Sequence, residues 1–198
     1  MQYKIFAVLC LGILASAALA DGPDKAEYEA CGKSRADAEV AVRQAQDFFT
    51  AGDQTWREVT LSLQAARAAA DDALMRRIDA EEKKPEDQRK QSVIDDAEQA
   101  RHDLDARWQH YGVDRAPALE SAFHDAEAEA ENSAELLHVL EDVETRLKES
   151  GQGLAPLASL YDETAASAAS AESAGQGALD SLKKIDQSWE PATQPSGD

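Results

Sequence analysis

The chain has 198 residues, and its 39 acidic side chains outnumber its 20 basic ones, which gives a formal charge of −19 at pH 7. So negative a charge repels phosphate groups, which argues against nucleic acid and anionic membrane surfaces as partners and favours a basic protein partner. Hydrophobic residues make up 43% of the chain, but alanine dominates them, and 6% of aromatic residues cannot build a thick globular core. Alanine and glutamate favour helix, and no stretch alternates as a strand does, so we predict an all-α fold.

Residues 1–20 have the pattern of a secretory signal peptide. Lys4 precedes an apolar run over 5–14, and the small residues that follow end in an A-x-A cleavage motif over 18–20. The apolar run is too short to remain as a membrane-spanning helix, and no later run is long enough to be a transmembrane segment. The sequence therefore predicts export to the cell surface, the periplasm or the extracellular space, with a mature chain that starts near Asp21.

A first helix is predicted over residues 24–84. Alternating steps of three and four from Tyr28 give sixteen positions, of which thirteen are apolar. This spacing is typical of a coiled-coil helix, and because it passes through Gly52 in phase we expect one helix rather than two. The positions of this seam are Tyr28, Cys31, Arg35, Ala38, Val42, Ala45, Phe49, Gly52, Trp56, Val59, Leu63, Ala66, Ala70, Ala73, Arg77 and Ala80.

The segment EEKKPEDQRK, residues 81–90, is predicted to be the turn after this helix. Eight of its ten residues are charged, as suits a turn exposed to solvent. Pro85 is well placed to begin a second helix, because proline is favoured in the first helical turn. The second helix is predicted over 86–149, so that two arms of similar length flank Pro85.

A break is expected within the second helix at 112–117, because Gly112 is a helix-stop signal and Pro117 suits the first turn of a new helix. The segment SGQGLAP is the next break, and a third helix is predicted over 155–189. Residues 191–198 are rich in proline, serine and glycine and are predicted to be disordered.

The two arms bury their seams only if they fold against each other. We therefore predict an elongated antiparallel coiled-coil hairpin with the third helix packed on its lower half, which makes one three-helix bundle over 21–190. The many alanines of the seams allow close helix approach, but each buries little apolar area.

The helix lengths also predict that the tryptophans converge. If the first two helices pair about Pro85 and the third folds back from its own turn, Trp56 and Trp189 lie at the height of the predicted break, with Trp108 and Tyr111 close to them. One interpretation is a buried aromatic cluster that covers the step from three helices to two. The other is an open aromatic pocket, which would be a ligand or partner surface.

Few residues of the sequence suggest a catalytic or metal-binding site. Glu135 and His138 form a Glu-x-x-His pair on one helix face, as in carboxylate-bridged metal bundles, but those sites need a second pair and the sequence has none. We therefore predict no metal, no cofactor and no enzyme activity. Cys31 is the one cysteine left after signal cleavage. It is either packed in the seam or forms an intermolecular disulfide, which would make a homodimer.

An acidic, alanine- and glutamate-rich exported chain with long helices resembles the alanine-rich helical-bundle surface proteins of trypanosomes. The stretches AEVAVRQAQ, QAARAAADDAL and HDAEAEAENSAELL carry this resemblance, which is one of composition and layout over about 24–190. It implies a helical bundle at a cell surface. Bacterial periplasmic coiled-coil proteins share the same composition.

Three classes of function are compatible with this sequence. The first is a non-enzymatic interaction or scaffold protein that binds a protein partner of unknown identity. The second is an amphipathic bundle that binds a lipid or an unfolded polypeptide, although an alanine-rich seam offers little apolar area for it. The third is a carboxylate/histidine metal-binding bundle, which only Glu135 and His138 support.

Overall fold

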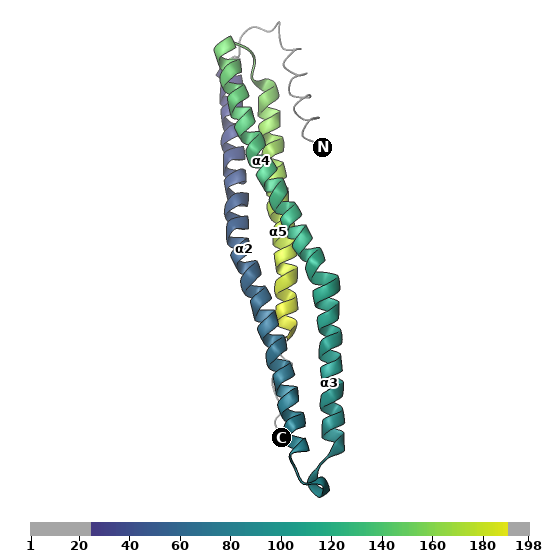
Figure 1. Ribbon diagram of the computed structural model, residues 1–198. Coiled ribbons are helices and arrows are strands. Elements are labelled where there is room, and N and C mark those ends of the chain that lie inside the picture. The colour runs from purple at the N-terminus through teal and green to yellow at the C-terminus, as the bar shows by residue number, and fades with distance from the viewer. Residues whose placement is uncertain (1–24, 190–198) are drawn as a thin grey trace. The chain divides into compact units, whose positions relative to one another are not determined.

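The computed structural model describes residues 25–189, and all of its long elements are helices (Figure 1). The prediction of an all-α helical bundle is confirmed, with no strand among the described residues. The elements are α2 (Lys25–Glu82), η1 (Glu86–Gln88), α3 (Gln91–Gln109), η2 (His110–Arg115), α4 (Ala116–Ser150) and α5 (Ala155–Trp189). The predicted signal peptide over 1–20 and the predicted disordered tail over 191–198 lie outside the described residues.

The chain divides into two compact units, where the sequence predicted one bundle over 21–190. Within the described residues, unit 1 comprises 25–49 and Ala126–Ser173, and unit 2 comprises Thr50–Asp125 and 174–189. The long helices α2, α4 and α5 each contribute residues to both units. No helix within residues 25–189 has an apolar stretch of the length that a membrane crossing requires.

Unit 1 is a three-helix arrangement of the first part of α2, the greater part of α4 and the first part of α5, which lie side by side (Figure 1). Its apolar core holds residues of all three helices and of the turn before α5. These are Cys31, Ala38, Leu140, Leu147, Leu154, Leu157 and Tyr161. Gly151 ends α4 with φ 70°, the left-handed conformation that glycine adopts without strain. Glu27 Oε2 then accepts a hydrogen bond from the Leu154 N–H at 3.1 Å, which fixes the turn against α2.

A buried carboxylate, Glu144, lies in the core of unit 1 with 2% of its surface exposed. Tyr161 Oη donates a hydrogen bond to it at 2.8 Å, Lys148 forms an ion pair with it, and Arg35 lies at 3.6 Å. Burial acts to raise the pKa of Glu144, but the hydrogen bonds from Lys148 and Tyr161 and the two positive charges outweigh it, so the pKa lies below its usual range. Burial and the hydrogen bond to Glu144 raise the pKa of Tyr161. Glu144 therefore stays charged and Tyr161 neutral at pH 7.

Unit 2 has three helices over part of its length and two near the connection between α2 and α3. Its larger core includes residues of α2, α3 and α5, and beyond it Ile78, Ile94 and Ala97 form a smaller cluster from α2 and α3 alone. The larger core consists of Leu63, Ala70, Leu104, Tyr111, Leu182, Ile185 and Trp189.

The last turns of the seam in α2 depart from the prediction. Ala73, Arg77 and Ala80 were expected to be buried, but they are exposed, and Ile78 and Glu81 are buried instead. The reason is the end of α5 at Trp189, past which the described residues supply only α3 as a partner for α2. With one partner helix, α2 buries the side that faces α3 and leaves the neighbouring side exposed.

The predicted break at 112–117 is wrong, because the backbone stays helical from α3 to α4. His110–Arg115 is a π-helix, and the Ala116 N–H donates to the Tyr111 carbonyl, five residues back. Pro117 has no N–H to donate to the carbonyl four residues before it, which is the bond that continues an α-helix. The wider π-turn accommodates this loss without an interruption.

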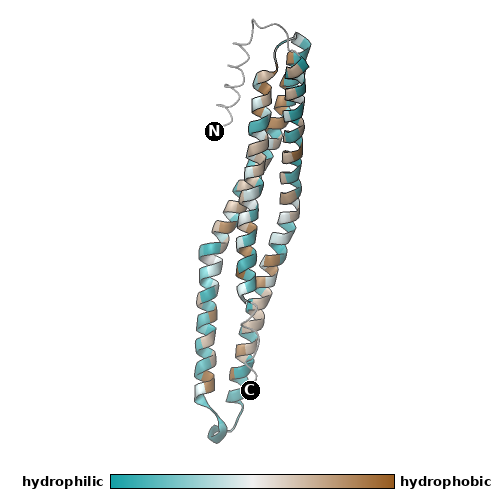
Figure 2. Ribbon diagram, turned by 180° about the vertical axis from the view of Figure 1, so that it is seen from behind, coloured by the Kyte–Doolittle hydropathy of each residue, from teal (hydrophilic) through white to brown (hydrophobic). Residues whose placement is uncertain are grey.

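The connection between α2 and α3 is hydrophilic (Figure 2) and is ordered by two side chains. Glu81, with 5% of its surface exposed, accepts hydrogen bonds from Lys84 Nζ and, at 2.7 Å, from the Lys90 N–H. Arg89 Nη2 donates to the carbonyl of Glu82 at 2.7 Å, which satisfies a free carbonyl at the end of α2. The highly charged segment is thus a structured turn.

We expect this turn to loosen in acid. The hydrogen bonds from Lys84 and Lys90 hold the pKa of Glu81 below its usual range, so its contribution to stability is present above the usual glutamate pKa and is lost as the pH falls through the lowered value. In an NMR titration the Lys90 amide should report a midpoint below the usual glutamate range. A midpoint within that range would show that Glu81 does not hold the turn.

Candidate functional site

The structure brings the four predicted aromatic residues into one cluster of unit 2, here called the aromatic cluster: Trp56, Trp108, Tyr111 and Trp189. Trp108 lies at its centre, with its ring centroid 5.6 Å from that of Trp189 in an edge-to-face contact and 5.3 Å from that of Tyr111. Trp56 packs against the same core, and its ring centroid lies 5.2 Å from that of Phe123. Three helices therefore meet at this point through their largest side chains.

The members of the aromatic cluster differ in how far they are buried. Trp189 and Tyr111 are 4% and 6% exposed, whereas Trp56 and Trp108 are half-buried. The two interpretations of the sequence, a closed core and an open aromatic surface, therefore apply to different members of the same cluster. Its role as a ligand or partner surface stays a prediction.

Two arginines that sequence reasoning missed stack on the tryptophans. The guanidinium carbon of Arg67 lies 5.0 Å from the ring centroid of Trp108, and that of Arg107 lies 4.8 Å from the ring centroid of Trp189. Arg107 also donates to the carbonyl of Ser188 at 3.3 Å, so it joins α3 to the last turn of α5. Such contacts are worth about 0.5–1 kcal/mol each at exposed sites. The sequence gives only a weak signal for these two contacts, because in each of them the arginine and the tryptophan lie on different helices.

The π-turn positions the aromatic residues. Trp108 lies in the last turn of α3 and Tyr111 lies in η2, so the π-turn begins between them, and both rings pack against α5. A Cβ atom at Gly112 would contact Trp108 Nε1 at 3.5 Å, so the backbone of the turn lies directly over that indole. Burial, and then the charges of Asp186 and Glu120, raise the pKa of Tyr111, and its hydroxyl therefore remains protonated at neutral pH.

One arginine beside the aromatic cluster has a buried nitrogen without a hydrogen bond. Among residues 25–189, the buried side-chain nitrogen and oxygen atoms without a hydrogen bond are Arg35 Nε and Arg67 Nε. Flat apolar rings edged with N–H and O–H donors suit a partner that brings apolar area together with acceptor oxygens.

Cys31 is completely buried in unit 1, which favours the packed interpretation over the intermolecular disulfide. Burial and the nearby charge of Glu144 raise the pKa of its thiol. We therefore expect a thiol reagent to label the native protein far more slowly than the denatured protein, because the thiolate is the reactive form. Migration as a reducible dimer on a gel without reductant, or labelling at the same rate in both states, would contradict this.

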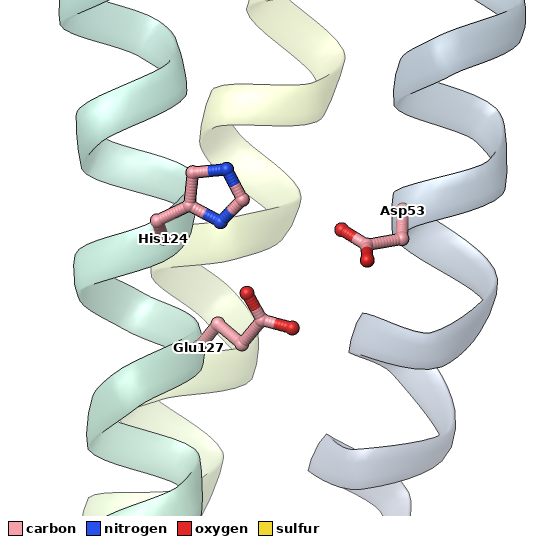
Figure 3. Close-up of side chains that lie close together, drawn as sticks. All are labelled: Asp53, His124 and Glu127. Atoms are coloured by element: carbon pink, nitrogen blue, oxygen red, sulfur yellow. The ribbon is translucent and has the colours of Figure 1, made fainter.

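Glu135 and His138, the weak metal candidates of the sequence, do not belong to a group of described residues whose ligand atoms lie close together. Both residues are exposed, and His138 Nδ1 lies 3.8 Å from a carboxylate oxygen of Glu141. Among the described residues, potential metal-ligand atoms lie close together at other side chains. Asp53 of α2 and His124 of α4, both in unit 2, have ligand atoms within 4.8 Å of each other, and Glu127 follows His124 one turn later on α4 (Figure 3).

The pair in unit 2 is a weak metal-binding feature. His124 is exposed, and Asp53 is also within 3.6 Å of Arg57, which competes for its carboxylate. Two ligands from unit 2 are fewer than the three or more that protein zinc sites use. Spacing along the chain gives no signal for this pair, because Asp53 and His124 lie on helices that are far apart in the sequence.

No protein-family model, no curated protein and no solved structure matches this chain. The resemblance to helical-bundle surface proteins of trypanosomes therefore stays a prediction from composition.

Proposed function

We propose that this chain is an exported, non-enzymatic interaction or scaffold protein that binds a protein partner through the aromatic cluster of unit 2. The observation that carries the proposal is the stacking of Arg67 and Arg107 on tryptophans whose cluster is only partly buried. Tryptophan, tyrosine and arginine are the residues in which the binding energy of protein interfaces is concentrated.

Two rings of the aromatic cluster, Trp56 and Trp108, keep part of their surface in water, where a partner can reach them. The surrounding bundle holds these rings in place through three helices, so a partner would meet a rigid surface that loses little side-chain entropy on binding. The acidic composition adds a preference for a partner with basic groups around the contact. The negative charge of the chain favours a protein partner over an anionic lipid surface.

A photo-crosslinker placed in the aromatic cluster tests the proposal. Trp108 is replaced by benzoylphenylalanine in the purified protein, which is then irradiated in the extracellular or periplasmic extract of the source cells. We expect one predominant crosslinked protein, and its loss when Arg107→Glu is added, because this change removes the cation on Trp189. The matched control carries the crosslinker at Leu61, which is 64% exposed on the same helix as Trp56.

Two results would contradict the proposal. Equal crosslinking at Leu61 and at position 108, or a crosslinked species that persists in the Arg107→Glu variant, would show that the aromatic cluster does not select a partner. Circular dichroism of each variant confirms that the helices are intact before the comparison is made.

A further inference from the structure

Arg67 of α2 covers part of the ring of Trp108. Its guanidinium carbon lies over the ring at 5.0 Å from the centroid, and its Nη2 donates a hydrogen bond to Asp105 Oδ1 of α3 at 3.0 Å. The side chain of Arg67 is 40% exposed, and Trp108 beneath it is half-buried. All three residues belong to unit 2. The guanidinium therefore shields part of an indole of the aromatic cluster from water.

This arrangement leaves one donor of Arg67 without a partner. Its Nε is buried and forms no hydrogen bond within the described residues. A buried N–H without an acceptor opposes the conformation that buries it, because the same group binds water when the side chain extends into solvent. The stack on Trp108 and the ion pair with Asp105 therefore hold Arg67 in place against the loss of that bond to water.

The ion pair with Asp105 is of a kind that holds weakly. Asp105 is 63% exposed, and an ion pair in contact with water stabilises little and is screened by salt. A second ion pair between the same two helices differs, because Arg101 of α3 binds Asp71 of α2 through its own Nε at 2.8 Å. When the side chain swings into solvent, the Nε of Arg67 gains a hydrogen bond to water, whereas that of Arg101 loses one to a carboxylate.

The other stacked arginine is fixed more firmly. Arg107 lies over Trp189, a ring that is only 4% exposed, and it also donates to the carbonyl of Ser188. It therefore joins α3 to α5 over a ring that the core already encloses. Among residues 25–189, Arg67 alone combines a stacked tryptophan of partial exposure with a buried, unsatisfied N–H.

We propose that Arg67 is a lid on Trp108 and that Asp105 holds this lid closed. In the closed state the guanidinium covers the ring, and in the open state it extends into water and leaves a larger part of the indole accessible to a partner. Ionic strength sets the balance, since salt weakens the ion pair with Asp105. This inference rests on the proposed function, because it names how access to the aromatic cluster is regulated.

Acrylamide quenching of Trp108 measures the lid without any partner. Trp56 and Trp189 are replaced by phenylalanine in the full chain, so that the emission comes from Trp108 alone. Raising sodium chloride from about 0.01 M to about 1 M shortens the screening length from about 30 Å to about 3 Å, and it should increase the quenching constant about twofold. Because acrylamide is uncharged, salt acts on the lid and not on the approach of the quencher.

Three variants in this background separate the lid from its surroundings. Asp105→Asn should raise quenching at low salt to the level that the parent protein reaches at high salt, and Arg67→Ala should raise it at least as far. Neither should respond further to salt. Asp103→Asn is the matched control, because it removes one charge from an exposed position of α3 whose carboxylate accepts a hydrogen bond from Gln99 and not from Arg67. It should behave as the parent protein does, and circular dichroism confirms that the helices are intact.

Exchange of the Arg67 Nε–H with water is a second measurement, made in the protein that keeps all three tryptophans in case their replacement disturbs unit 2. Nuclear magnetic resonance should show slow exchange at low salt, because Nε is buried while the lid is closed. Exchange should become about twofold faster or more at high salt, where the ion pair is screened. Asp105→Asn should show the faster exchange already at low salt.

A fixed stack would give a different result. Quenching of Trp108 that is equal in Asp105→Asn and Asp103→Asn, together with Nε–H exchange that salt does not change, would overturn the proposal.

The partner captured by crosslinking tests the regulation of access. In Asp105→Asn the partner concentration that half-saturates the Trp108 emission change should fall about twofold or more, because the apparent affinity scales with the fraction of open protein. An unchanged concentration in a variant whose quenching has risen would refute this regulation. Failure to capture any partner counts against the proposed function alone, since quenching and exchange are measured without one.

Discussion

Replacing Trp189 by alanine should lower the free energy of unfolding of unit 2 by about 3–5 kcal/mol, the range for large aromatic side chains removed from cores. Trp189 is 4% exposed and is the last described residue of α5. Its removal takes away the edge-to-face contact with Trp108 and the surface on which Arg107 stacks. Hydrogen exchange of amides in α5, measured against denaturant, gives this free energy directly.

Trp56→Ala is the matched comparison, because it removes the same side chain from a half-buried position of the same unit. It should destabilise unit 2 by clearly less than Trp189→Ala. Amides of α4 in unit 1 serve as the internal reference, and their exchange should change little in both variants. The account of the aromatic cluster is wrong if Trp56→Ala has the larger effect, or if Trp189→Ala has no effect on exchange within α5.

Replacing Glu144 by alanine should destabilise unit 1 by about 3–5 kcal/mol, which is the cost of breaking a buried ion pair by removing one partner. The change leaves the buried hydroxyl of Tyr161 without its acceptor and the nearby Lys148 and Arg35 without their common carboxylate. Chemical denaturation at pH 7, followed by far-ultraviolet circular dichroism, measures the loss.

The loss of stability caused by Glu144→Ala should become smaller as the pH falls. Its pKa in the folded state lies below the usual glutamate range, so its stabilising contribution is complete above that range and is lost as the pH falls through the folded value. Glu144→Gln keeps the shape and an acceptor for Tyr161, and it should cost less than Glu144→Ala. A difference between wild type and Glu144→Ala that stays constant from neutral to strongly acidic pH would contradict this account.

Most of the helix layout could be predicted from the sequence, because the seams obey one rule of spacing. The third helix, predicted over 155–189, coincides with α5 (Ala155–Trp189). The rule failed at Ala73, Arg77 and Ala80, where the number of neighbouring helices changes, and at Tyr28, which is 39% exposed in the first turn of α2. Spacing along one helix shows which residues share a side, but the number of partners decides how much of that side is buried.

The break at 112–117 was predicted from Gly112 and Pro117, but these two residues alone do not predict a π-turn. Glycine and proline mark a weak point in a helix, whereas the choice between a gap and a wider turn depends on tertiary contacts. Here Tyr111 of the π-turn packs into the core beside Trp108, which favours a continuous backbone.

The aromatic cluster could be located in the sequence, but its chemistry could not. Pairing helices about their turns placed Trp56, Trp108 and Trp189 at one height, which is a matter of residue counts. The arginines on the tryptophans and the exposure of Trp108 depend on side-chain directions across three helices. The hydrogen bond from Tyr161 to Glu144 could not be predicted either, since the two residues lie on different helices.

Tryptophan fluorescence of single-tryptophan variants tests the central claim most directly. With the other two tryptophans changed to phenylalanine, Trp189 should emit at short wavelength and resist iodide, while Trp108 should be partly quenched in the free protein. Addition of the partner identified by crosslinking should shift the emission of Trp108 to shorter wavelength and protect it from iodide. Emission and quenching of Trp108 that stay unchanged at saturating partner would contradict the claim that the aromatic cluster is the binding surface.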